Sequence, residues 1–169
     1  MYGIIATWRM ALEGISKADS MLKNNESAAD SIEEAIKAVE DFEYYKSVGY
    51  GGLPNEEMEV ELDAAFMDGD TLEFGCVGGI KDFANPVSIA RSLMHYDANN
   101  FLIGQGAEKY ASRHGFERKT MLTDRAKIHY HNRTKEITNT ELKPYSGHDT
   151  VGMVCLDTAG HMTCATSTS

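Results

Sequence analysis

The order in which helix-like and strand-like patterns follow one another constrains the fold of this chain most. Apolar residues recur at helical spacing in some segments and alternate with polar residues in others. The expected elements, in chain order, are a short buried strand at 3–7, helices at about 8–22 and 28–39, a hairpin at 62–77, a helix from residue 86, a short buried strand at 101–104, a helix at 106–114 and a hairpin at 151–168. This order predicts a mixed α/β (α+β) domain in which helices pack on a largely antiparallel sheet.

Several helix boundaries carry local signals. Asn24 and Asn25 interrupt the first helical pattern, and Ser27 is a typical N-cap for the second. Pro86 stands where a helix is expected to begin, in the first turn that proline favours. The apolar stripes expected to face the core are Met10, Leu12, Ile15, Ala18 and Leu22 in the first helix and Ala28, Ile32, Ala35, Ile36 and Val39 in the second.

The segment from about residue 117 to 147 is polar, charged and weakly periodic, which predicts helix fragments and a mobile connection. Its His129-x-His131 pair has strand spacing for two metal ligands, but no third ligand is evident nearby, so surface histidines are the favoured interpretation. The Gly104-x-Gly106 pair lacks the third glycine of a dinucleotide-binding loop. We therefore expect neither a metal nor another cofactor.

Composition excludes several partner classes. A formal net charge of −10 argues against nucleic-acid binding, whose affinity comes largely from phosphate neutralisation. No apolar run approaches the roughly 18 residues that span a bilayer, and residues 1–8 lack the basic start of a signal peptide, although one could have been removed. Three cysteines, Cys76, Cys155 and Cys164, make no disulfide framework, so we expect a reducing, cytoplasmic compartment and buried thiols at Cys155 and Cys164.

The Asp149-Thr150 bond, which leads straight into an alternating strand, could carry chemistry. A threonine hydroxyl is a weak nucleophile and needs an adjacent base. If the bond were cut, the freed α-amine of Thr150, with a reference pKa of roughly 7.7–8.0, could be that base. The uncut chain has an amide there and would be a zymogen. A threonine that opens a strand after an aspartate is in itself commonplace, so the residues alone leave a purely structural role open.

The surrounding motifs resemble those of the glycosylasparaginases (aspartylglucosaminidases), N-terminal nucleophile hydrolases of the threonine-type asparaginase family. The similarity runs in family order along essentially the whole chain. Its motifs are Thr7-Trp8, the glycine-rich stretch 47–54, residues 62–64 and 67–69, Gly75 to Gly79, the Asn85–Arg91 segment, and His148 to Val154 followed by 165–169. The resemblance implies a four-layer αββα sandwich, of which this chain supplies the first half and the opening hairpin of the second.

The resemblance also implies roles for particular residues. Thr150 would be the nucleophile, both for cleavage of the 149–150 bond and for catalysis, and Thr168 would hydrogen-bond it and tune it. His148 and Asp149 would shape the strained scissile turn, with Asp149 a candidate proton acceptor. Trp8 would line the substrate pocket; the alternative for Trp8 is an anchor in the core.

The implied reaction is hydrolysis of the amide that joins N-acetylglucosamine to asparagine, a step in glycoprotein degradation. Residues 1–149 would form the α-subunit-like half of one domain and residues 150–169 the start of the β-subunit-like half. The implied partners are a small glycosyl-asparagine substrate, the remainder of the β subunit, and a second copy in a homodimer of processed heterodimers. Two alternatives stay open: an L-asparaginase or β-aspartyl peptidase of the same mechanism, and an inactive truncated remnant that needs a partner chain.

One departure from the family pattern matters. The family continues with an Arg-Val-Gly-Asp stretch and a later Thr-Gly, which hold the substrate's α-carboxylate and α-amine and supply the oxyanion hole. Neither motif occurs within the 169 residues. We also expect an open sheet edge near residues 161–169, which would have to be covered because unpaired strands aggregate.

Overall fold

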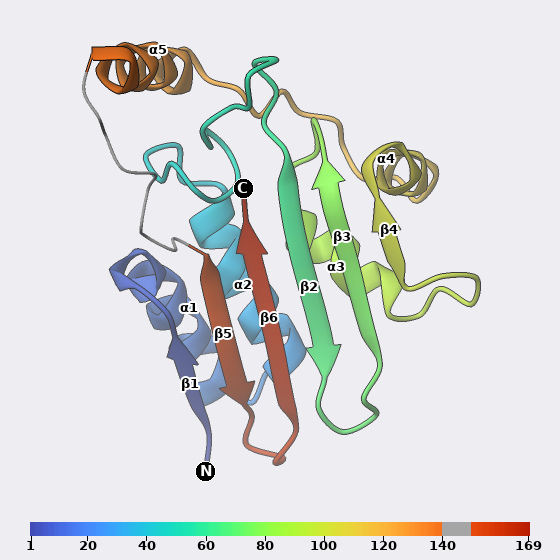
Figure 1. The fold of residues 1–169 in the computed structure, drawn as a ribbon. Helices are drawn as coiled ribbons and strands as arrows, with labels where there is room; N and C mark the ends of the chain where they lie inside the picture. The colour runs from blue at the N-terminus through green and yellow to red at the C-terminus, as the bar shows by residue number, and fades with distance from the viewer. Residues whose placement is uncertain (140–149) are drawn as a thin grey trace.

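The computed structural model describes residues 1–139 and 150–169 and contains one six-stranded sheet (Figure 1). The strands are β1 (Gly3–Ala6), β2 (Leu62–Asp68), β3 (Phe74–Ile80), β4 (Phe101–Ile103), β5 (Val151–Leu156) and β6 (Met162–Thr168). Their order in the sheet is β1-β5-β6-β2-β3-β4. All neighbours are antiparallel except β3 and β4, so the prediction of a largely antiparallel sheet is confirmed.

Helices cover one face of this sheet. Behind it in Figure 1 lie α1 (Leu12–Lys23), which follows a short 3₁₀ turn at Arg9–Ala11, α2 (Ala28–Glu40) and α3 (Pro86–Leu93). Beside β4 lies α4 (Gly104–Arg113), and α5 (Asp124–Asn139) lies beyond one end of the strands. The described residues thus form a helical layer on a sheet, which is the mixed α/β arrangement that the sequence predicts.

The second helix forms where its sequence pattern predicts. Ser27 Oγ accepts a hydrogen bond from the amide of Asp30 at 3.0 Å, which satisfies one of the free donors at the start of α2. The whole predicted stripe on this helix is buried, namely Ala28, Ile32, Ala35, Ile36 and Val39. This stripe packs against β5 and β6 and ties both strands to the core.

The predicted stripe on the first helix is partly wrong. Leu12 remains 53% exposed, whereas Ala11 and Gly14 are buried. A Cβ at Gly14 would lie 2.3 Å from the carbonyl oxygen of Ala35, so α1 and α2 touch through small residues rather than through a leucine. The prediction relied on large apolar side chains, whereas at Gly14 the backbones of the two helices come into close contact.

Two predictions about the strands are also wrong. The segments 3–7 and 101–104 were expected to be buried, yet Ile5 is 71% and Ile103 is 67% exposed. The open edge expected near 161–169 is absent as well, because β6 pairs with β5 on one side and with β2 on the other. The edges of the sheet are β1 and β4. Apart from these two edges, the face of the sheet opposite the helices is also uncovered (Figure 1).

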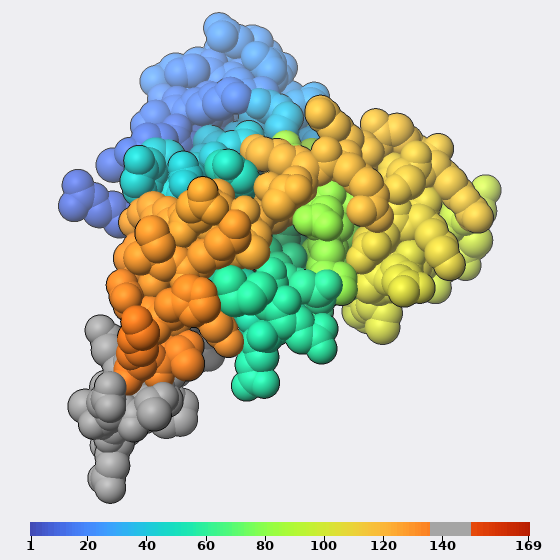
Figure 2. Space-filling model, turned by 90° about the horizontal axis from the view of Figure 1, so that it is seen from above, coloured from blue at the N-terminus to red at the C-terminus, as the bar shows by residue number. Residues whose placement is uncertain are grey.

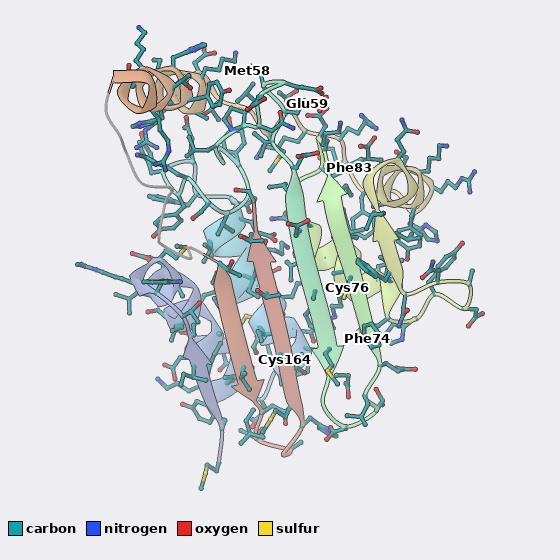
Figure 3. All side chains as sticks on the ribbon, in the orientation of Figure 1. Met58, Glu59, Phe74, Cys76, Phe83 and Cys164 are labelled. Carbon is teal, nitrogen blue, oxygen red and sulfur yellow. The ribbon has the colours of Figure 1, made fainter. Side chains whose placement is uncertain are left out.

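That open face is apolar and hollowed. Figure 3 labels three of its side chains, Phe74, Cys76 and Cys164, on the side of the sheet that faces the viewer. The hollow crosses β1, β5, β6, β2 and β3, and the residues that line it include Ile5, Thr7, Met67, Phe74, Cys76, Val154, Cys164 and Thr166. An αββα sandwich would place its second sheet against this face.

Two connections differ from expectation. Residues 124–139 form the continuous helix α5 instead of helix fragments. The strand expected from residue 71 begins only at Phe74, because Asp68 Oδ1 accepts hydrogen bonds from the amides of Asp70 and Thr71 and closes a wider turn. Among the described helices, none is long and apolar enough to cross a membrane.

The close contact between β3 and α3 yields a stability prediction. A Cβ at Gly75 would lie 2.0 Å from the carbonyl oxygen of Ala90, so Gly75→Ala should lower the free energy of unfolding by about 1–3 kcal/mol. Gly106→Ala is the matched control, because a Cβ at this exposed position of α4 would meet nothing within 4 Å. Urea unfolding of the two variants tests the contact, and equal stabilities would contradict it.

Candidate active site

Two threonines meet at the end of the sheet where β5 begins and β6 ends. The antiparallel register pairs Val151 with Ser167, so Thr150 and Thr168 lie opposite one another just beyond that pair. The Thr150 hydroxyl donates a hydrogen bond to Thr168 Oγ1 at 3.1 Å. The structure thus brings together the two threonines that the sequence separates by 18 residues.

A chain of hydrogen bonds continues from this pair. Thr168 Oγ1 donates to the carbonyl oxygen of Ser47 at 3.4 Å, and the amide of Ser169 donates to the same oxygen at 2.8 Å. Hydrogen bonds in series polarise one another. Thr168 therefore accepts from Thr150 while its own proton is held by a backbone carbonyl, an arrangement that increases electron density on Thr150 Oγ1.

Thr7 fixes the backbone around Thr150. Its hydroxyl donates to the Thr150 carbonyl oxygen at 2.9 Å and accepts from the Gly152 amide at 2.8 Å. The Thr7 amide also donates to the Gly152 carbonyl at 2.9 Å. On the other side of the strand, Thr166 Oγ1 donates to the Val151 carbonyl at 2.9 Å. These bonds hold the first three residues of the β5 segment from both neighbouring strands.

The Thr7 contact has little signal in the sequence. Thr7 belongs to a motif of the family resemblance, but the resemblance assigns it no role. Its partners are more than 140 residues away in the sequence, and no local period or spacing predicts contacts of that range.

Trp8 stands next to Thr7 at the same end of the sheet. Its side chain is 55% exposed, so it is not the core anchor that was the alternative. Its backbone has φ 61° and ψ 151°, a positive-φ conformation that is uncommon for a large residue. The exposed indole is available for contact with a ligand or with another part of the protein.

A glycine-containing loop supplies the Ser47 carbonyl. Within it, the Tyr50 amide donates to the Glu40 carbonyl at 2.7 Å and the Gly51 amide donates to the Met121 carbonyl at 2.9 Å. Gly49 has φ 65°, and a Cβ there would lie 2.2 Å from the Glu40 carbonyl oxygen, so this position requires glycine. Figure 2 looks onto this end of the molecule, where residues 120–135 lie against the loop region before β2.

The other candidates lie elsewhere or outside the described residues. His148 and Asp149 fall in the segment 140–149, so the structure does not test their roles.

Burial raises the pKa of the Cys155 thiol to about 11, which keeps it protonated, whereas Cys164 is only half-buried. His129 and His131 lie two residues apart on α5. Within residues 1–139 and 150–169, no three His, Cys, Asp or Glu side chains gather as metal ligands would.

Comparison with protein families gives one match over most of the chain. The model of the family Asparaginase_2, described as asparaginase, matches residues 6–169. This range contains the two threonines, the glycine-containing loop and every strand of the sheet except the first residues of β1.

Individual relatives carry related names. An N(4)-(β-N-acetylglucosaminyl)-L-asparaginase from Elizabethkingia miricola is 32% identical over 98% of the chain and 48% of its own length. An isoaspartyl peptidase/L-asparaginase from Rattus norvegicus is 36% identical over 92% of the chain and 49% of its length. A plant-type L-asparaginase from Thermococcus kodakarensis is 38% identical over 72% of the chain and 35% of its length. The chain spans about half the length of the first two relatives.

The Thr7 contacts can be tested by mutation. Thr7→Val keeps the shape of the side chain but removes its hydrogen bonds to the Gly152 amide and the Thr150 carbonyl. Because Thr7 is exposed and water can replace part of both bonds, the free energy of unfolding should fall by about 1 kcal/mol. Thr7→Ser should restore most of the loss. Thr158→Val, which removes a hydroxyl from an exposed turn, should stay within about 0.5 kcal/mol. A Thr7→Val variant as stable as Thr158→Val would contradict the assigned contacts.

Proposed function

This chain belongs to the asparaginase family, and we propose that it carries the nucleophile of an amidohydrolase of the glycosylasparaginase type. The fold is of the N-terminal nucleophile hydrolase type, with helices on one face of the sheet. The observation that carries the proposal is the hydrogen bond from the Thr150 hydroxyl to Thr168 at 3.1 Å. It gives a hydroxyl nucleophile an oriented partner at the first residue of a strand, directly after the bond expected to be cut.

Cleavage of the 149–150 bond is the first proposed step. The Thr150 hydroxyl attacks the carbonyl carbon of Asp149, the C–N bond breaks, and the acyl group moves from nitrogen to oxygen. The leaving nitrogen takes up the proton that the hydroxyl gave up and becomes the free α-amine of Thr150. Water then hydrolyses the ester, which restores the hydroxyl and leaves Asp149 with a terminal carboxylate. Asp149 is proposed as the proton acceptor, and His148 as a residue that shapes the turn.

Catalysis would use the same hydroxyl with the new amine as base. Thr150 attacks the side-chain amide carbonyl of the substrate, the aminosugar leaves with a proton, and a β-aspartyl ester forms. Water hydrolyses this ester and releases aspartate. Trp8, exposed at the same end of the sheet as Thr150, is proposed to contact the substrate.

The division at residue 149 and the partners belong to the same proposal. Residues 1–149 act as the α-subunit-like half, and residues 150–169 begin the β-subunit-like half. The remainder of the β subunit covers the open apolar face of the sheet and supplies the groups that grip the substrate. The assembly is a homodimer of processed heterodimers that binds neither nucleic acid nor membrane.

A second candidate is hydrolysis of asparagine or of β-aspartyl peptides by the same mechanism. It is favoured by the isoaspartyl peptidase/L-asparaginase from Rattus norvegicus, whose identity of 36% over 92% of the chain is higher than the 32% of the glycosylasparaginase, which aligns over 98%. A third candidate, an inactive remnant that needs a partner chain, would have neither activity.

Self-cleavage is tested by intact-mass spectrometry with the second half of the family domain supplied. We expect a species of residues 1–149 and a fragment that begins at Thr150. Thr150→Ala removes the attacking oxygen and should give uncut chain, whereas Thr150→Ser, which keeps a hydroxyl, should still be cut. Thr166→Ser is the control, since it alters a neighbouring threonine on β6 without touching the scissile bond. A wild-type chain that stays intact would overturn the proposed mechanism.

Substrate class is tested by aspartate release. We expect kcat/KM for N-acetylglucosaminyl-asparagine to exceed that for a β-aspartyl dipeptide by at least about tenfold, because a site shaped for one leaving group rejects the other. The reverse preference would favour the second candidate. Equal background rates for wild type and Thr150→Ala on both compounds would favour the remnant.

A further inference from the structure

Glu40 places a carboxyl group in the interior of the molecule. Its side chain is completely buried at the C-terminal end of α2. Oε1 accepts a hydrogen bond from the amide of Val87 at 3.1 Å, and Oε2 accepts one from Asn85 Nδ2 at 3.2 Å. Both donors lie at the N-terminus of α3, whose helix dipole favours a negative charge there. The carboxyl group therefore ties α2 to the start of α3.

The same carboxyl lies beneath β6. Ser167 is completely buried on the helix-facing side of β6, and α2 packs against this strand. The Ser167 hydroxyl is close enough to lower the Glu40 pKa, although its Oγ meets no partner with full hydrogen-bond geometry. The Glu40 side chain thus lies next to Ser167 on the helix side of the sheet, and Thr168 follows Ser167 along β6.

The Glu40 backbone provides a second connection to Thr168. Its carbonyl accepts the Tyr50 amide at 2.7 Å, and Gly49 packs directly on it. The loop that contains these residues also presents the Ser47 carbonyl, which accepts from the Thr168 hydroxyl. One residue therefore contacts both the strand that carries Thr168 and the loop that holds the Thr168 proton.

We propose that Glu40 is a positioning residue for the threonine pair: by supporting Ser167 and the Ser47 loop, it fixes Thr168 against Thr150. The proposal rests on the proposed amidohydrolase function for its effect on turnover. Its structural part, the order of the β6 end, stands independently of that function. In the ionised form the carboxylate accepts from the Val87 amide and the Asn85 amide group and lies next to the buried Ser167 hydroxyl, so this is the form that positions the pair.

The carboxyl group of Glu40 changes its charge near neutral pH. Burial, the largest influence, raises its pKa to about 7, against the hydrogen bonds from Ser167, Val87 and Asn85, which lower it. The charged group that faces it is Asp41, which raises the pKa further. The polar side chains that face it from the other packed elements, Asn85 and Ser167, carry no charge. The ion pair between Arg91 and Glu33 lies about two helical turns back along α2.

The raised pKa makes the ionised carboxyl unfavourable for folding. The unfolded chain releases this proton near the ordinary value of 4.5, whereas the folded chain keeps it up to about pH 7. The folded state therefore binds more protons in that window, and its stability falls as the pH rises from about 4.5 through about 7. Glu40→Gln removes this loss. A purely structural role thus predicts that Glu40→Gln is harmless, while a positioning role predicts that it impairs the site.

The experiment compares Glu40→Gln with Asp41→Asn in the chain with the second half of the domain supplied. Both variants remove a carboxylate that accepts from Asn85 Nδ2, but Asp41 is exposed and does not reach Ser167. For Glu40→Gln we expect unchanged or higher thermal stability at pH 8, a kcat about tenfold lower and a KM within about twofold of wild type. Below pH 7 the protonation of two groups should lower the wild-type kcat, whereas the protonation of one group should lower the kcat of Glu40→Gln. Asp41→Asn should keep the wild-type profile.

Hydrogen exchange separates the positioning role from the proposed function. Faster exchange of the amides of residues 166–169 in Glu40→Gln, with no change in Asp41→Asn, is expected whether or not the protein turns over substrate. An active wild type with an unaltered Glu40→Gln profile and unaltered exchange would overturn the positioning role alone. An inactive wild type would overturn the proposed function, and the exchange result would then decide on Glu40.

Discussion

The insertion of the β5–β6 hairpin between β1 and β2 is the interaction on which the rest of the structure depends. Residues 151–168 pair with β1 on one side and with β2 on the other. Their inward side chains, Val151, Met153, Cys155 and Ala165, are buried against the helices. Without this hairpin, the first strand and the β2–β3 hairpin would not share a sheet. The position of Thr150 follows from it, because a strand at the centre of the sheet is held by hydrogen bonds along both edges.

The local elements could largely be predicted from the sequence, since their signals are local. Ser27 capped the helix it was expected to cap, and Pro86 began one where proline is favoured. The burial of individual residues was harder to predict, because it depends on how the helices and strands pack against one another. Ile5 and Ile103 belong to short apolar segments that resemble core strands, yet both residues lie on the uncovered face of the sheet. The sequence also does not show the order of the strands in the sheet, so an open edge was expected at β6, although this strand is central.

The candidate site divides in the same way. The family resemblance implied a contact between Thr150 and Thr168, and the structure has a hydrogen bond of 3.1 Å between their hydroxyl groups. Thr7 and Glu40 could not be found in this manner. Thr7 reaches Thr150 from the far end of the sequence, and Glu40 is a charged residue outside the apolar stripe of its helix that is nevertheless completely buried. Both act through tertiary contacts that have no local period.

The strand order also bears on how the chain folds as it is synthesised. Along the chain, β1 precedes its partner β5 by more than 140 residues, and β5 and β6 are made after all the other described strands. Until then, β1 and β2 lack the strands between them, and α2 lacks the two strands on which its apolar stripe packs. Contacts of such long range form slowly, and a nascent half-sheet exposes unpaired edges while it waits. The six-stranded sheet can therefore be completed only after residues 151–168 have been made.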